Sequence, residues 1–138
     1  MRVVLDTNVL ISAIAFGGNP RKLLETILRG EPKLFLCDYI LNELNGVLQR
    51  PKFGFPPDVI RTIISELNAI GYIVTPSVRI RKIKEDPSDN RILECAVEAN
   101  ADYIMSGDTH LLNQKVYRNV KVISPAEYLK IHSKLEKY

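Results

Sequence analysis

The sequence has few of the features that mark secreted, membrane-bound or disulfide-rich proteins. It contains two cysteines, Cys37 and Cys95, which form no Cys-x-x-Cys pair and lie in apolar stretches. We expect two buried free thiols without a redox or metal role. No apolar run is long enough to span a bilayer, and no basic leader or cleavage site is visible at the N-terminus. These absences predict a cytoplasmic protein without a membrane partner.

Histidine is also scarce, with only His110 and His132 in 138 residues. Neither has a histidine or cysteine at metal-ligand spacing, so both are expected to be surface or structural residues. His110 follows Asp108 by two residues, and contact with a substrate phosphate is the alternative for it. Any metal site would therefore depend on oxygen ligands.

The positive charge of the chain is small in sum but concentrated in one place. The net charge is +3, which permits a polyanionic partner without requiring one. Four cations, Arg79, Arg81, Lys82 and Lys84, fall within six residues. They form either a solvated loop or a strip that attracts phosphates. With Arg91 and His110 they are the candidate substrate-binding residues.

Strand-like and helix-like patterns alternate along the whole chain. Strands are expected at 2–5, 33–37, 72–75, 103–105 and 120–123, and helices at 9–16, 20–30, 38–48, 58–71, 90–100 and from 125 onward. Val59, Ile60, Ile63, Ile64 and Leu67 are expected to face inward, 51–57 to be a loop, and the tail beyond Ile131 to fray. Such alternation predicts one α/β domain over 1–138, with a mostly parallel sheet and helices on both faces.

Four acidic residues stand at or near the strand-to-helix junctions. Asp6 ends the first strand, Glu43 lies in the helix after the second, Asp89 opens the helix after the basic segment, and Asp108 follows the strand at 103–105. The carboxyl ends of parallel strands share one edge of a sheet, where ligands usually bind. We therefore expect these carboxylates to converge.

Several acids also have an ordinary structural explanation. Asp38, Asp58 and Ser124 are expected to cap helices. Asp86 or Asp89 could cap the helix at 90–100, and Asp108 could cap a turn. Glu43 is harder to explain in this way, because its neighbours in the helix are apolar.

Converging carboxylates repel one another and raise each other's pKa unless a cation neutralises them. Oxygen ligands without histidine or thiolate favour a hard ion, Mg²⁺ or Mn²⁺. The sequence thus predicts a divalent-metal site at one edge of the sheet.

The order of these motifs resembles that of the PIN-domain nucleases over nearly the whole chain. The matching segments are Asp6-Thr7-Asn8, Glu43-Leu44, the block at 86–93 and Ser106-Gly107-Asp108. The segment at 50–53 and the Gly-Gly-Asn-Pro loop at 17–20 are similar to a subgroup of toxin components of toxin–antitoxin pairs.

The resemblance implies a three-layer α/β/α fold and Mg²⁺- or Mn²⁺-dependent hydrolysis of RNA by a metal-activated water. It implies that Asp6, Glu43, Asp89 and Asp108 are the catalytic metal-site acids. Further residues would support the site, Asn8 and Ser106 as polar neighbours and Asn90 and Asp86 as outer candidates. A homodimer and an antitoxin partner bound near the site are also implied.

Two other classes of protein remain open. A phosphatase or phosphoacceptor domain would use Asp6 as a nucleophile, although a dehalogenase-like enzyme would need an acid where Asn8 stands. A non-catalytic module of the same fold would only bind RNA or a protein.

Overall fold

The fold is built on a six-stranded sheet, seen in a computed structural model that describes residues 1–136 and the surroundings of side chains up to 132. The strand order is β3-β2-β1-β4-β6-β5, and only β5 runs antiparallel to its neighbour. The strands are β1 (Arg2–Leu5), β2 (Lys33–Leu36), β3 (Tyr72–Ile73), β4 (Tyr103–Met105), β5 (Val116–Tyr117) and β6 (Val120–Ile123).

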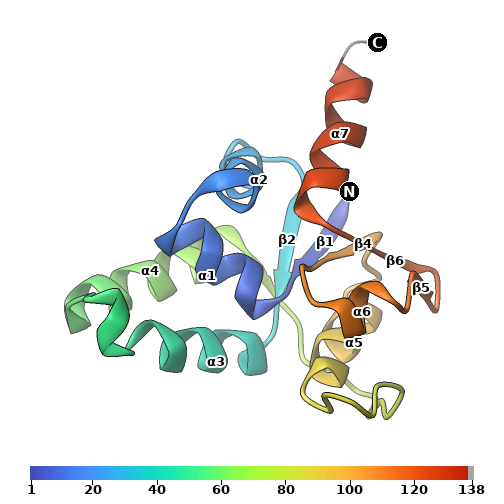
Figure 1. Ribbon diagram of the computed structural model, residues 1–138, viewed down its shortest axis with the longest axis horizontal. Coiled ribbons are helices and arrows are strands. Elements are labelled where there is room, and N and C mark those ends of the chain that lie inside the picture. Colours follow the sequence, from blue (N-terminus) through green and yellow to red (C-terminus); the bar gives the residue numbers. More distant parts are fainter. Residues whose placement is uncertain (137–138) are drawn as a thin grey trace.

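Helices flank this sheet (Figure 1). They are α1 (Thr7–Ala15), α2 (Gly18–Leu28), α3 (Asp38–Leu48), α4 (Pro57–Ile70), α5 (Asp89–Glu98), α6 (Thr109–Leu112) and α7 (Pro125–Glu136), with a short 3-10 helix, η1 (Pro51–Phe53). Helix α5 packs against β1, β2 and β4, whereas α1 packs against α2 and α3. The expected α/β fold with a mostly parallel sheet is confirmed.

The central strands form the core because both of their faces are covered. Val3, Val4 and Leu5 of β1 are fully buried, as are Leu34 and Leu36 of β2. Near-continuous apolar runs of this kind are typical of parallel strands that pack between helices. The core thereby fixes the carboxyl ends of β1, β2 and β4.

The strand order reverses between β1 and β4. The chain builds β1, β2 and β3 outward in one direction and then returns to place β4 on the other side of β1. In open α/β sheets the crevice at such a switch point is the usual place for a ligand. Asp6 and Asp108 follow the two strands that border it.

Some expected helix starts were wrong. Asp38 and Asp58 do not cap α3 and α4, which begin from Cys37 and Pro56 without a side-chain cap. Both acids lie within the first turn instead, where a negative charge still favours the positive end of the helix dipole. Ser124 does cap α7, because its Oγ accepts a hydrogen bond from the backbone N–H of Glu127.

Other differences concern burial and the ends of elements. Val59 was expected to face inward but is 38% exposed, while Ile60 and Leu67 form the buried stripe of α4. The third strand stops at Ile73, and α7 continues past Ile131 to Glu136. The short elements η1, α6 and β5 were not expected, because two to four residues carry too little periodicity to predict one.

Two further expectations concern the cysteines and membrane-spanning helices. Cys37 and Cys95 are buried and free, as predicted. Among the described residues, no helix combines the length and apolar character that a membrane span requires.

Candidate metal centre

Asp6 both caps a helix and faces the switch-point crevice. Its Oδ1 accepts a hydrogen bond from the backbone N–H of Val9 at 2.8 Å, and its Oδ2 accepts one from the Ser106 hydroxyl. The side chain is buried, with only 4% of the residue exposed. The carboxylate is therefore held in one position by two elements, the start of α1 and the end of β4.

Ser106 joins the ends of the two central strands. Besides donating to Asp6, its Oγ accepts a hydrogen bond from the backbone N–H of Asp108 at 2.9 Å. Asp108 Oδ1 accepts from the backbone N–H of His110 at 2.7 Å, which caps α6. The fully buried Ser106 thus fixes the loop that carries the second carboxylate.

Three carboxylates meet where α5 begins. Oxygen atoms of Asp86, Asp89 and Asp108 lie within 4.8 Å of one another. Asp86, expected only as an outer candidate, is part of this compact triplet. The turn before α5 places it there, because the backbone N–H of Asp89 donates to the Asp86 carbonyl at 3.0 Å.

A second set of acids surrounds a small cavity beside this triplet. Its lining residues are Asp6, Thr7, Asn8, Tyr39, Glu43, Ser88, Asp89 and Ile92. The cavity measures about 20 Å³, room for little more than one particle the size of a water. Glu43 reaches it from α3, where the Tyr39 hydroxyl donates to Glu43 Oε2 at 2.6 Å.

Asp89 belongs to both sets and connects them. The structure therefore brings Asp6, Glu43 and Asp89 to one cavity and sets Asp108 next to Asp89, although these residues are spread over 103 positions of sequence (6 to 108). The carboxylates come from the ends of β1 and β4 and from α3 and α5, which meet at this edge of the sheet (Figure 1).

The electrostatics of the cluster are those of acids without a counter-charge. Burial raises the pKa of Asp6 to about 6, and the nearby Asp108 and Glu43 add to the rise, while hydrogen bonds from Ser106 and Val9 oppose it. Burial likewise raises the pKa of Asp89 to about 7, with repulsion from Asp108, Asp86 and Asp6 and a small opposing effect of His110. Ionising these acids therefore costs free energy, and a bound cation would remove that cost.

The residues present fit a hard divalent ion. Asp89 Oδ2 is buried and has no hydrogen-bond partner, and the same holds for Thr7 Oγ1. Buried polar atoms are normally paired, and a carboxylate oxygen inside an acidic cluster with no protein partner is suited to bind a cation. An all-oxygen donor set suits Mg²⁺ or Mn²⁺.

The comparison with known families agrees with this geometry. The profile of the family described as PIN domain matches residues 2–110, a span that includes every acid of the two sets. The chain belongs to the PIN-domain family. PIN domains are in general nucleases that use divalent metals, which accords with an acidic cluster at the switch point.

The PIN domain also has a distant relative among curated proteins. It is 27% identical over 142 residues to an uncharacterized protein of Methanocaldococcus jannaschii, covering 94% of this chain and 90% of that protein. The similarity thus extends beyond the family profile to nearly the full length of both chains.

Two candidate residues of the PIN domain make contacts other than those expected. Asn90 is buried, and its amide is bonded to the backbone of Ile83. Arg91, a candidate for substrate contact, is paired with Glu94 at 2.8 Å and bonded to the carbonyl of Ile80 at 3.0 Å. Both residues hold the segment that precedes α5.

The other candidates lie at the surface of the site. Asn8 is exposed at the cavity, and His110 lies close enough to lower the pKa of Asp89. The candidate cations of the segment at 79–84 are exposed, namely Arg79, Arg81, Lys82 and Lys84.

Tyr39, Thr7 and Ser88 also line the cavity, although the sequence motifs did not predict them as site residues. One signal was available for Tyr39, which precedes Glu43 by four positions and so shares its helix face. Thr7 lay inside the Asp-Thr-Asn motif without a role. For Ser88 the sequence carried no signal beyond its place in an acidic turn.

Proposed function

We propose that the protein is a divalent-metal-dependent endoribonuclease that hydrolyses phosphodiester bonds of RNA. The observation that carries the proposal is the pair of acid sets sharing Asp89, built at the switch point of a PIN-domain sheet. Several converging carboxylates, two of them with raised pKa values, are explained by the binding of a cation and a polyanion rather than by packing.

The carboxylates would share the binding of Mg²⁺ or Mn²⁺. Asp6, Glu43 and Asp89 line the cavity, and Asp86 and Asp108 lie next to Asp89. When bound there, a divalent ion would supply neutralisation of the phosphate charge and activation of water for in-line hydrolysis. The expected products carry a 5′-phosphate and a 3′-hydroxyl.

The surrounding side chains would keep the acids ionised and fixed. The Ser106 hydroxyl donates to Asp6 and so favours its charged form, opposing the effect of burial. Tyr39 holds Glu43 at its position on α3. Asn8 and His110, at the rim, would contact the phosphate of the substrate.

The decisive test is cleavage of a single-stranded RNA with Mn²⁺ by the Asp89→Asn variant. Asp89 is common to both sets, so we expect a loss of at least ~100-fold, more than is typical for residues that only orient ligands. Asp58→Asn, which removes an exposed carboxylate in α4, is the matched control and should cleave like the parent protein. Undiminished cleavage by Asp89→Asn would refute the assignment.

A phosphoacceptor function of Asp6 is disfavoured by its contacts. Both oxygens accept hydrogen bonds from the protein, and the residue is 4% exposed. A nucleophile must move one oxygen onto phosphorus, whereas a metal ligand stays in place and can bind through a lone pair that the hydrogen bonds leave free. Mass spectrometry after incubation with a phosphodonor should find no phosphoaspartate.

A non-catalytic binding module is the remaining alternative. It predicts that Mn²⁺ neither binds nor raises the melting temperature, since the acids would then serve only the fold. The nuclease proposal predicts a clear rise.

The finer part of the proposal is that the nuclease is the toxin of a toxin–antitoxin pair, acting in the cytoplasm as a homodimer and blocked by an antitoxin. It is supported by the segments at 17–20 and 50–53, the second of which forms η1 and the turn before it. Induced expression of the protein should arrest the growth of the host cells, and expression of the Asp89→Asn variant should not. Arrest by both proteins alike would contradict the toxin assignment.

A further inference from the structure

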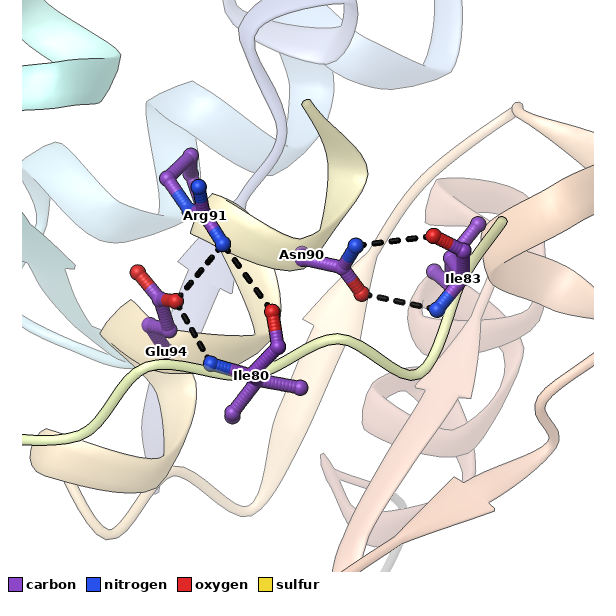
Figure 2. Close-up of polar contacts among 5 residues, drawn as sticks. All are labelled: Ile80, Ile83, Asn90, Arg91 and Glu94. Carbon is purple, nitrogen blue, oxygen red and sulfur yellow. Dashed lines mark hydrogen bonds and ion pairs between the residues drawn. The ribbon is translucent and has the colours of Figure 1, made fainter. Parts of the chain in front are cut away.

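The segment at 79–84, called here the basic strip, has no secondary structure but is fixed at two points (Figure 2). The Asn90 amide bonds to Ile83 twice, accepting from its N–H at 2.8 Å and donating to its carbonyl at 2.8 Å. Three residues earlier, the N–H of Ile80 donates to Glu94 Oε2 at 2.8 Å, and the carbonyl of Ile80 accepts a hydrogen bond from Arg91 at 3.0 Å. Side chains of α5 thus take the place of a neighbouring strand.

This clamp is made of polar groups that are themselves buried. Asn90 is 3% exposed and Glu94 is 4% exposed, and Arg91 lies against Glu94 at 2.8 Å. Burying an amide and a carboxylate is favourable only if their hydrogen bonds are made. Here their hydrogen bonds go to the backbone of a loop, so buried polar side chains hold this loop in one conformation.

In this fixed conformation the apolar side chains of the basic strip are buried and its charged side chains are exposed. Ile80 and Ile83 point into the core, with 3% and 2% of each residue exposed. The four cations, Arg79, Arg81, Lys82 and Lys84, are all exposed. The apolar anchors and the clamp together present a row of positive charge to solvent.

The row of charge is not closed off by ion pairs within the described part of the chain, although Glu85 lies close enough to Lys84 to interact with its charge. The part of the chain that the structure describes has two ion pairs, Met1 with Glu31 and Arg91 with Glu94, and neither includes a cation of the basic strip. The exposed Glu85, next in sequence, is the acid nearest to Lys84 along the chain. Cations that serve only solubility need no fixed backbone, which argues for a ligand.

The basic strip adjoins the acid cluster at its end, and at its start it borders a pocket that shares one lining residue with the acid cavity. Its last residue is two positions before Asp86, a member of the carboxylate triplet. At its start, Arg79 lines a pocket of about 440 Å³ together with Tyr39, which also lines the acid cavity. A chain lying along the strip would therefore pass beside the carboxylates.

We propose that the basic strip is the surface on which the sugar–phosphate backbone of single-stranded RNA lies, and that Asn90, Arg91 and Glu94 are positioning residues that hold it. The proposal rests on the proposed function. Arginine forks and lysine ammoniums match phosphate groups, and such binding is electrostatic. An acidic peptide fits less well, because the exposed residues of the strip itself are all cations and the one exposed apolar neighbour, Val78, lies just before it.

The first test compares two variants of equal charge. One replaces the four strip cations (R79Q, R81Q, K82Q and K84Q), and the control replaces four exposed cations elsewhere (K22Q, R29Q, K121Q and K130Q). The control residues lie on α2, α7 and the start of β6, away from the carboxyl edge of the sheet. Binding of a fluorescent 12-mer of oligouridine is followed by anisotropy in EDTA, at several salt concentrations.

The strip variant should lower the salt slope by about 3, since each phosphate contact to a single strand contributes ~0.7. Its affinity should fall on the order of 100-fold at 0.1 M salt, while the control changes much less. Equal losses in the two variants would overturn the proposal, because net charge alone would then explain binding. A polyglutamate peptide that binds the strip as tightly as the RNA would overturn it in favour of an acidic protein.

The second test concerns the clamp. Asn90→Ala leaves all four cations in place, but hydrogen exchange at the amide of Ile83 should accelerate and RNA affinity should fall. Glu94→Gln, which keeps an oxygen to accept from Ile80, should lose less. Fast exchange at Ile83 with unchanged RNA affinity would refute the positioning role.

These outcomes are separable from those of the proposed function. Binding in EDTA requires no cleavage, so the basic strip is tested even if Asp89→Asn cleaves normally and the nuclease assignment fails. Conversely, if Asp89→Asn is inactive and the strip variant binds RNA like the control, only the strip proposal fails.

Discussion

Replacing Asp6 with asparagine tests whether the fold carries an unneutralised charge. Asparagine is nearly isosteric, and its Oδ1 can still accept the hydrogen bond from Val9 that caps α1. The change removes the charge and leaves the packing, but it also replaces the oxygen that accepts from the Ser106 hydroxyl by an amide nitrogen that can only donate. That replacement is present at every pH. What the loss of the charge alters is the dependence of stability on pH in the absence of metal.

The magnitude follows from the raised pKa of Asp6, which moves from 3.8 to about 6. A carboxylate whose folded pKa is raised favours the fold when protonated, and this advantage is lost as pH rises from about 4 through 6. A shift of about two units corresponds to about 3 kcal/mol. The difference in unfolding free energy, Asp6→Asn minus parent, should therefore grow by up to about 3 kcal/mol between pH 4 and pH 8.

The assay is urea denaturation in EDTA at pH 4, 5, 6, 7 and 8. Asp58→Asn, which removes an exposed acid from the first turn of α4, is the matched control and should show a much smaller trend. Because Asp89 titrates nearby, the acids share their protons and the midpoint belongs to the cluster. A difference between Asp6→Asn and parent that stays constant over this pH range would refute the electrostatic argument.

Three further predictions concern the same fold. Ser106→Ala removes a hydrogen bond to the charged form of Asp6. By urea denaturation, the unfolding free energy should fall by about 1.5–3 kcal/mol at pH 8 and by less at pH 4, where Asp6 is protonated. An equal loss at both pH values would contradict this. Gly71→Ala should destabilise by about 1–3 kcal/mol, since a Cβ there would lie 2.6 Å from Leu36 Cδ1, whereas Gly46→Ala in α3 meets nothing within 4 Å and should stabilise by up to about 1 kcal/mol. Mn²⁺ at 100 times its Kd should stabilise the parent by about 2.7 kcal/mol, a rise of roughly 10 °C in Tm by calorimetry, and Asp89→Asn should show little of this rise.

Much of the fold could be predicted because the sequence carries its periodicity locally. The buried strands at 2–5 and 103–105 are apolar runs, and α4 shows a clear apolar stripe ending at Gly71. The errors fall where local signals are weak. Val59 fits a helical stripe as well as Ile60 does, and only the angle at which α4 meets the core leaves it exposed.

The candidate site could be predicted in part for a similar reason. Acids that follow parallel strands must share an edge, so the common edge of Asp6 and Asp108 follows from strand direction. Their proximity follows from the pairing of β1 with β4, which only the structure shows. The place of Asp86 in the triplet could not be predicted, because it depends on the turn at 86–89. The roles of Asn90 and Arg91 could not be seen, because their partners lie seven and eleven positions earlier on a loop without periodicity.

The sequence by itself determined the α/β class, the parallel strands and the types of residue at their ends, since these depend on local pattern and chain direction. Only the tertiary structure decided that Asp89 joins two sets of carboxylates, that Ser106 couples Asp6 to Asp108, and that α5 clamps the basic strip. Hydrogen bonds and repulsion act over a few ångströms, and which distant residues come within that range depends on how the helices pack on the sheet.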